Sequence, residues 1–424
     1  MVGRSLAPLR HSLDTSLRAP PSKSVTHRAL VVAALADGAS TLHDVLQADD
    51  TGVTLDGLRA LGIDVVLDAG GVARVQGVPP EVRGGARIPL RDSGTSMRFL
   101  LAVAALGEFP STLDGSERLR QRPLAELARA LGLLGAPVAL LGRAGQGLPA
   151  TAGGQRPEGG AVRLAGGTSS QFASALLLVG PRMVRGLDLT LEPPLVSLPY
   201  VELTVRVLEA FGTRVERRGP GAWRIDPGAP RATQFRIEGD HSTASYFLAA
   251  AAVVGGRVRV CGLDPGSTQP DARIGAVLER AGCRVTRGSD WVEVQAGPAL
   301  LPLEEDLTDA PDLAPTLALI GLFAEGTTDL RGLGHLRHKE SDRLAVIAGN
   351  LRRFGCQVEI TADRLRFTPP PRSRLRGVVV DTSSDHRIAM AFALAGLVIE
   401  GVAVDDADCV SKSNPEFWSQ LAQL

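Results

Sequence analysis

Hydrophobic and polar positions recur along the chain with a period of about 70 residues. Each copy has a short polar cluster, then about ten residues rich in Ala, Leu and Val, then Gly and a β-rich stretch. Six copies follow one another, with equivalent positions 70, 73, 73, 71 and 72 residues apart. These positions are Arg28, Arg98, Gln171, Ala244, Pro315 and Arg387. Because a repeat decides the architecture, the pattern predicts six copies of one supersecondary unit.

Each unit is predicted to mix helix and strand. The apolar run is long enough for a helix buried on most sides, and the Gly and β-branched residues after it indicate a turn into a strand. Amphipathic segments such as "LAELARALGLLG" and "RLAVIAGNLRRFG" lie between the copies and predict second helices that end near Gly. Units of this size favour closed α/β domains, and a solenoid scaffold is the alternative that the period leaves open.

The polar clusters all precede the apolar helices. A helix N-terminus presents unpaired N–H groups and the positive end of the helix dipole, which favours an anion by roughly 0.3–1 kcal/mol at an exposed position. Several such ends converging on one cleft predict a site for a polyanion.

Length and composition narrow the class of protein. A chain of 424 residues suits two large domains, and a net charge of zero argues against nucleic acid or an anionic membrane as partner. The apolar runs stop short of the roughly 18 residues of a membrane span, and the N-terminus lacks an apolar signal core. The four cysteines form no CxxC pair, so we expect no metal and a reduced, cytoplasmic location.

Lysine is rare in this chain, which has 43 arginines and only Lys23, Lys339 and Lys412. Arginine is a broad planar cation that stays protonated, whereas lysine is a compact charge whose pKa moves on burial. We therefore expect these three lysines where a small cation or a proton carrier is required. The alternative is that they remain on the surface by chance.

The segment "HKESDR" combines two cations and a carboxylate before a predicted helix. Lys339 and Arg343 are four residues apart and are expected to face each other, which is unfavourable without an anion between them. Glu340, held among cations, can act as a general acid if its pKa is tuned toward neutrality. The alternative is a solvated charge run.

Three further clusters carry candidate ligand-binding groups. "RDSGTSMR" places Gly94 where a backbone can approach a ligand, and "GGTSSQF" supplies hydroxyl and amide groups suited to phosphate or sugar oxygens. "SDHR" places Asp385, His386 and Arg387 at the same position of its repeat. Helix capping alone would explain one serine and the aspartate. The chain has no GxxxxGK[ST], GxGxxG, HExxH or GxSxG motif.

Read together, the motifs resemble the 3-phosphoshikimate 1-carboxyvinyltransferase (EPSP synthase) family of enolpyruvyl transferases over essentially the whole chain. They are, in order, "PSKSVTHR", "SGTSMR", "RQRPLAEL", "GGTSSQF", "VSLPYVELT", "DAPDLAPTLA", "HKESDR", "SSDHRIAM" and "SKSNPEF". The resemblance implies transfer of the enolpyruvyl group of phosphoenolpyruvate to the 5-hydroxyl of shikimate 3-phosphate, with release of phosphate, on the route to chorismate and aromatic amino acids. It also implies no metal or organic cofactor, and we expect a monomer.

The fold implied by the resemblance is a two-domain inside-out α/β barrel with three repeats per domain. The chain of the family crosses between domains twice, here near Pro20 and Gly239. We therefore expect a continuous domain over residues 20–239 and a discontinuous domain made of residues 1–19 and 240–424.

The resemblance also assigns residues to ligands. Asp312 corresponds to the base near the 5-hydroxyl, Glu340 to the acid that protonates the methylene carbon, and Lys23 is also catalytic. The residues expected to bind shikimate 3-phosphate are Lys23, Ser24, Arg28, Ser169, Ser170, Gln171, Ser197, Asp312, His335 and Lys339. The residues expected to bind phosphoenolpyruvate are Lys23, Gly94, Arg122, Gln171, Arg343, Arg387 and Lys412.

Some positions depart from the common pattern of the family. His335 stands where some members have an Asn that binds shikimate 3-phosphate, and Phe99 stands where many have Pro. Gly94 itself leaves the space expected of a member that glyphosate inhibits.

Two other functions remain to be weighed. The sister transferase that acts on UDP-N-acetylglucosamine generally carries a reactive Cys, or in some members Asp, on a loop equivalent to "GEFPSTLDGSERLRQRP", but no Cys precedes Cys261. An RNA-end-processing relative built from similar repeats is disfavoured by zero net charge and only two tyrosines. A noncatalytic scaffold would not need Glu340 beside Lys339.

Overall fold

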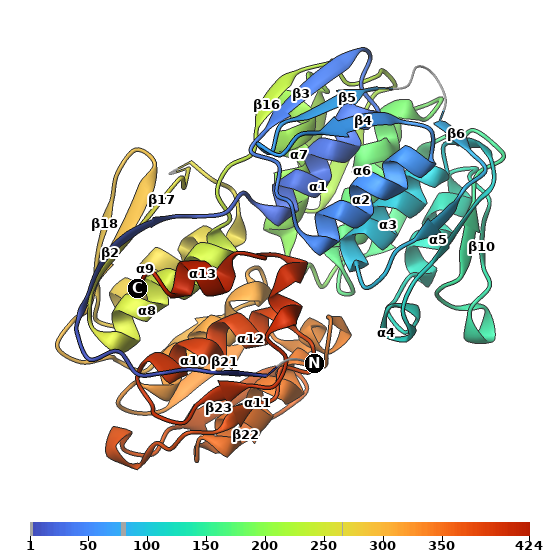
Figure 1. Ribbon diagram of the computed structural model, residues 1–424. Helices are drawn as coiled ribbons and strands as arrows, with labels where there is room; N and C mark the ends of the chain where they lie inside the picture. The colour runs from blue at the N-terminus through green and yellow to red at the C-terminus, as the bar shows by residue number, and fades with distance from the viewer. Residues whose placement is uncertain (1–2, 78–81, 265) are drawn as a thin grey trace. The chain divides into compact units, whose positions relative to one another are not determined.

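The computed structural model describes residues 3–77, 82–264 and 266–424 and divides the chain into two compact units (Figure 1). Unit 1 contains Met1–Pro20 and Glu238–Leu424, and unit 2 contains Pro21–Ile237. These boundaries differ from the expected ones by one or two residues. The N–H of Gly239 donates to the carbonyl of Gly262, and the N–H of Asp240 donates to the carbonyl of Pro20, so these residues belong to unit 1.

Unit 2 is built from three four-stranded sheets of one design. In each, the strand before the buried helix pairs in parallel with the strand after it, and two antiparallel strands follow. The sheet orders are β16 (Gln234–Arg236), β3 (Ala39–His43), β5 (Ala73–Gln76), β4 (Asp64–Leu67); β7 (Arg87–Pro89), β9 (Ser111–Asp114), β11 (Ala150–Ala152), β10 (Val138–Leu140); and β12 (Gly160–Ala165), β13 (Leu187–Glu192), β15 (Ala222–Ile225), β14 (Val215–Gly219). A short parallel pair, β6 (Val82–Gly84) and β8 (Gly107–Phe109), is added.

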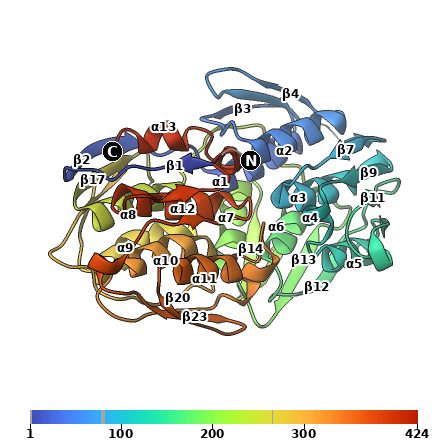
Figure 2. The same ribbon diagram turned by 60° about the horizontal axis from the view of Figure 1, so that its bottom comes forward.

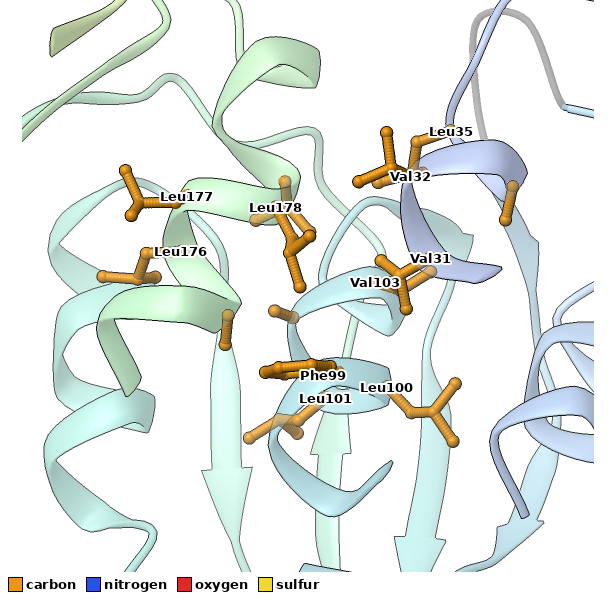
Figure 3. Close-up of a cluster of buried hydrophobic side chains, with 14 of the residues drawn as sticks. Val31, Val32, Leu35, Phe99, Leu100, Leu101, Val103, Leu176, Leu177 and Leu178 are labelled. Carbon is orange, nitrogen blue, oxygen red and sulfur yellow. The ribbon is translucent and has the colours of Figure 1, made fainter. Parts of the chain in front are cut away.

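Three apolar helices form the centre of unit 2. They are α1 (Lys23–Ala34), α3 (Gly94–Ala104) and α6 (Ser170–Val179). Figure 3 shows their side chains meeting, with the ring of Phe99 beneath Leu178 and Val31 near Val103. The second helices are α2 (Asp49–Ala60), α5 (Ala125–Leu133) and α7 (Leu198–Ala210), and α4 (Glu117–Arg120) is a short turn before α5.

Unit 1 repeats this design, with one sheet reduced to three strands. The sheet orders are β2 (Leu13–Arg18), β17 (Gly256–Cys261), β19 (Trp291–Gln295), β18 (Arg284–Arg287); β20 (Glu304–Asp306), β21 (Thr328–Arg331), β23 (Arg364–Thr368), β22 (Gln357–Ile360); and β24 (Val379–Val380), β25 (Ala403–Val404), β1 (Arg4–Ser5). Its buried helices are α8 (His241–Val254), α10 (Ala314–Leu322) and α12 (His386–Ala393), which lie side by side (Figure 2). The second helices are α9 (Ile274–Arg280), α11 (Arg343–Arg353) and α13 (Phe417–Leu421).

The six predicted apolar runs are thus six buried helices, each enclosed by the sheets of its own unit. The predicted fold class, a two-domain α/β fold with helices inside, is confirmed. Across the described ranges, no helix combines the length and hydropathy that a membrane crossing requires.

The two crossings exchange strands between the repeats. β2 leads directly to α1, yet it pairs in parallel with β17, which follows α8. β16 leads to α8, yet it pairs with β3, which follows α1. The β2–β17 ladder requires glycine at its start, because a Cβ on Gly256 would lie 2.1 Å from the carbonyl oxygen of Leu13. Each unit is therefore completed by a strand from the far side of a crossing.

Candidate active site

In unit 2, Lys23 begins α1 and is held by a carboxylate from α2. Its Nζ lies 3.0 Å from Oδ2 of Asp50, and both side chains are almost fully buried. The carbonyl of Asp50 accepts from Oγ of Ser96 in the first turn of α3. These two contacts hold the N-terminal turns of α1, α2 and α3 together, so the predicted convergence of helix N-termini occurs within this unit.

Arg28, one turn further along α1, is 2% exposed and donates to four groups. These are Oγ1 of Thr204 at 2.7 Å, Oγ of Ser174 at 3.3 Å, and the carbonyls of Ser24 at 2.8 Å and Tyr200 at 3.0 Å. Burial lowers the pKa of the guanidinium to about 10. None of the four acceptors is a carboxylate, so none of them neutralises the charge. A buried charge held in this way favours an anionic ligand.

The N-terminal turns of α3 and α6 are joined through Arg98. Its Nη1 donates to the carbonyl of Gly94 at 3.0 Å and to Oε1 of Gln171 at 2.9 Å, while Nε2 of Gln171 donates to Thr95. A Cβ on Gly94 would lie 2.3 Å from Nη1 of Arg122. Only glycine therefore lets the Arg122 guanidinium lie against this turn, which places Gly94, Arg122 and Gln171 together.

The predicted serines have different local roles. Ser169 caps α6, since its Oγ accepts from the N–H of Gln171 at 3.3 Å, so the capping interpretation holds for this serine. Ser170 is buried in the first turn of that helix. Ser197 has a φ of 55° and is buried directly before α7. Ser24 follows Lys23 in α1 and is half-buried.

In unit 1, Arg343 is 1% exposed and bonds to three carboxylates. Its Nε lies 2.9 Å from Oδ2 of Asp385, Nη1 lies 2.9 Å from Oδ1 of Asp312, and Nη2 lies 2.8 Å from Oε2 of Glu340. Although burial alone would lower the pKa of Arg343, these three carboxylates raise it above its usual value. The expectation that Lys339 and Arg343 oppose each other across an anion was therefore incomplete. Carboxylates of the protein surround the arginine.

Asp312 connects Arg343 to Arg387. Its Oδ2 lies 2.7 Å from Nη2 of Arg387, whose Nη1 reaches the hydroxyl of Tyr246 at 3.5 Å. Burial would raise the pKa of Asp312, but Arg387, Lys339 and Arg343 together hold it well below its usual range. Asp312 is therefore an ionised carboxylate at neutral pH, which is the state that a proton acceptor requires.

His335 and Lys412 complete the predicted set in unit 1. Burial, followed by the charge of Lys339, lowers the pKa of His335 to about 3, so its imidazole is neutral. Its Nε2 has no hydrogen-bond partner among the described residues. Lys412 is buried on η8 (Asp408–Lys412), a short 3-10 helix packed against α12.

Several residues that position these groups were not predicted from the sequence. Asp50 holds Lys23, Arg98 holds Gln171, and Tyr246 contacts Arg387. Asp385 was recognised only as a capping residue, whereas it also pairs with Arg343. These partners lie in other repeats or other helices, and no local spacing signals their contacts. The described residues contain no group of three or more His, Cys, Asp or Glu side chains that could hold a metal ion.

Comparison with known proteins gives consistent matches over nearly the whole chain. Residues 9–421 match the family model for EPSP synthase (3-phosphoshikimate 1-carboxyvinyltransferase). A protein of that name from Methanosphaerula palustris is 44% identical over 414 residues, which is 97% of this chain and 96% of the relative. Another from Methanoculleus marisnigri is 43% identical over 412 residues, 96% of each chain. The solved structure of EPSP synthase from Acinetobacter baumannii is similar, with a TM-score of 0.82 and 26% identity over 99% of this chain and 97% of that one.

Proposed function

Because this chain belongs to the EPSP synthase (3-phosphoshikimate 1-carboxyvinyltransferase) family, we propose that its buried cations and carboxylates divide the family's reaction between them. The enzyme transfers the enolpyruvyl group of phosphoenolpyruvate to the 5-hydroxyl of shikimate 3-phosphate, and the products are 5-enolpyruvylshikimate 3-phosphate and phosphate. The reaction belongs to the shikimate route to chorismate and aromatic amino acids. The observation that supports the assignment of roles is the cluster of Asp312 and Glu340 around Arg343.

Asp312 is proposed as the base. It accepts the proton of the 5-hydroxyl while the 5-oxygen bonds to C2 of phosphoenolpyruvate. Arg387 and Arg343, which each bond to one of its oxygens, support this role by keeping the carboxylate ionised. Phosphate then leaves as the C–O bond to C2 breaks, and a proton returns from the new methyl group to the enzyme.

Glu340 is proposed as the acid that protonates the methylene carbon of phosphoenolpyruvate. In the ligand-free protein it is paired with Nη2 of Arg343, a cation that favours its ionised form. When the substrate carboxylate occupies Arg343, Glu340 loses that partner, and its pKa is expected to rise. Substrate binding would thus convert this carboxylate into a proton donor.

The remaining predicted residues are proposed to bind the anionic groups of the two substrates. Two phosphates and two carboxylates bring about six negative charges. Each close ion pair in a partly solvated site contributes up to about 4 kcal/mol before the cost of desolvation. Shikimate 3-phosphate is assigned to Lys23, Ser24, Arg28, Ser169, Ser170, Gln171, Ser197, Asp312, His335 and Lys339. Phosphoenolpyruvate is assigned to Lys23, Gly94, Arg122, Gln171, Arg343, Arg387 and Lys412.

Phosphate release by the purified protein tests the function directly. We expect release when phosphoenolpyruvate and shikimate 3-phosphate are both present, and none when UDP-N-acetylglucosamine replaces shikimate 3-phosphate. The named relatives do not favour the nucleotide sugar as acceptor. Release with UDP-N-acetylglucosamine alone would reassign the acceptor, and no release with either would refute the function.

We also propose a cytoplasmic location and a monomeric state. All four cysteines are free, which supports a reducing compartment. Sedimentation of the purified protein tests the oligomeric state.

A further inference from the structure

Asp271 is a buried carboxyl group to which the proposed mechanism gives no role. It lies on η3 (Pro270–Arg273), a short 3-10 helix of unit 1, and is 1% exposed. Oγ of Ser242 donates to its Oδ2. Its Oδ1 has no hydrogen-bond partner among the described residues. One oxygen thus has a single donor and the other has none.

The charged groups that face Asp271 come from three elements. η3 and η4 (Pro311–Leu313) both pack against α8. Asp240 faces it from the N-cap of α8, Asp312 from η4 and Arg387 from α12. Arg387 is already paired with Asp312. Two of the three charged neighbours are therefore carboxylates, and the third is a cation that bonds to one of them.

Neighbouring basic groups are engaged elsewhere. Arg273, two residues along η3, bonds to Glu305 and to the carbonyl of Asp306. The ring of His241 in α8 interacts with Asp240 and Asp264, and burial lowers its pKa. Neither group neutralises Asp271.

An ionised carboxylate in this environment is unfavourable. A buried charge needs several hydrogen bonds or a paired cation, and a neighbouring like charge disfavours ionisation further. Burial, followed by the charge of Asp312, raises the pKa of Asp271 to about 7. The geometry and the charges therefore agree that this carboxyl group keeps its proton up to neutral pH.

We propose that Asp271 is a positioning residue that acts on phosphoenolpyruvate binding through Arg387. As a neutral acid it leaves Arg387 to Asp312 and the substrate. Once it ionises, a second carboxylate competes for the same guanidinium, and the affinity for phosphoenolpyruvate falls. This inference rests on the proposed function, because it assigns Arg387 to that substrate.

Kinetics of Asp271→Asn between pH 6 and pH 8.5 test the proposal. The amide keeps the shape of the neutral acid, so at pH 6 both kcat and KM are expected within about threefold of wild type. As pH rises, the KM for phosphoenolpyruvate should increase about tenfold more in wild type than in the variant, as for a change of one pKa unit. Titration of the substrate phosphate is common to both proteins and cancels in the ratio.

The matched control is Asp290→Asn, which removes an exposed carboxylate of the same unit. Its KM should follow pH as wild type does. If Asp271→Asn also follows the wild-type curve, or if kcat rather than KM carries the difference, the proposal is wrong. Failure of the proposed function is distinct, because wild type itself would then release no phosphate.

A second measurement needs neither activity nor a folded variant. In ligand-free wild type with ¹³C-labelled aspartate carboxyls, we expect one resonance whose midpoint lies near pH 7. If no aspartate resonance titrates above pH 6, Asp271 is ionised at neutral pH and the proposal is overturned.

Discussion

At the residue scale, the short ion pair of Lys23 with Asp50 leaves little room for a larger cation. A guanidinium is broad and planar, whereas the ammonium group is compact, and both partners here are almost fully buried. The chain uses arginine at 43 other positions, so lysine at this position indicates a steric or protonic requirement.

Lys23→Arg is therefore expected to fold normally and to lose most of its turnover, by about a hundredfold or more if the lysine takes part in proton transfer. Steady-state kinetics alongside circular dichroism measure both effects. The control is Arg59→Lys, a swap at an exposed ion pair with Asp56, which should leave turnover unchanged. Wild-type kinetics for Lys23→Arg would contradict the requirement for a compact cation.

Glu340→Gln tests the proposed acid. Glutamine has nearly the same shape but cannot donate a proton to carbon, so turnover should fall by about 10²–10⁴-fold. Calorimetry should still detect binding of both substrates. Glu279→Gln, at an exposed pair with Arg287, serves as the control. Unchanged turnover in Glu340→Gln would exclude this residue from the mechanism.

The raised pKa of Asp271 also affects stability. The folded protein keeps this proton up to about pH 7, whereas the unfolded chain releases it near the ordinary value of about 4. Unfolding in that window releases a proton, so this group lowers wild-type stability progressively as pH rises from about 4 to about 7. The stability of Asp271→Asn relative to wild type should therefore increase across the window and level off above it. Urea unfolding at pH 5, 6, 7 and 8 would show this, and a constant difference would contradict it.

At the element scale, one aspartate joins two helices. Asp385 caps α12 by accepting from the N–H of Arg387 at 3.0 Å, and it also bonds to Nε of Arg343 in the first turn of α11. Ser341 adds a third hydrogen bond to this carboxylate. The cap of one helix therefore sets the direction of the guanidinium on another.

Asp385→Asn separates these two roles. Asparagine is as good a cap as aspartate, but the buried ion pair with Arg343 is lost, which costs about 3–5 kcal/mol. We expect a lower midpoint of thermal unfolding and a raised KM for phosphoenolpyruvate. Asp342→Asn, at the capping aspartate of α11, should lose much less stability, because its pair with Arg337 is partly exposed. Equal losses in the two variants would show that capping alone matters at Asp385.

At the scale of the whole molecule, the strand exchange makes the two units unequal. Unit 2 is one continuous segment that contains all of its strands. Unit 1 needs the N-terminal segment, because β2 forms a six-residue parallel ladder with β17 and buries Leu13 and Leu17.

A fragment of residues 21–237 should therefore unfold cooperatively, whereas a fragment of residues 238–424 should not. Chemical denaturation followed by circular dichroism distinguishes the two. Fusing residues 3–20 to the second fragment through a flexible linker should restore its cooperative transition. Cooperative unfolding of residues 238–424 alone would show that the β2–β17 ladder is dispensable.

The sequence by itself determined the six repeats, the buried helices and the family. Those features depend on periodic hydrophobic patterns and on short motifs, which local chemistry controls. The lysines and the "HKESDR" segment could be singled out for the same reason, because an unusual residue type or a local crowding of charge is visible without a structure.

Only the tertiary structure decided which groups are paired. Arg343 bonds to Asp312 and Asp385, which lie 31 and 42 residues away, and Asp271 lies among carboxylates of two other elements. Such contacts join different repeats, so no spacing along the chain encodes them. Burial and neighbouring charge then set each pKa, and both are properties of the folded molecule.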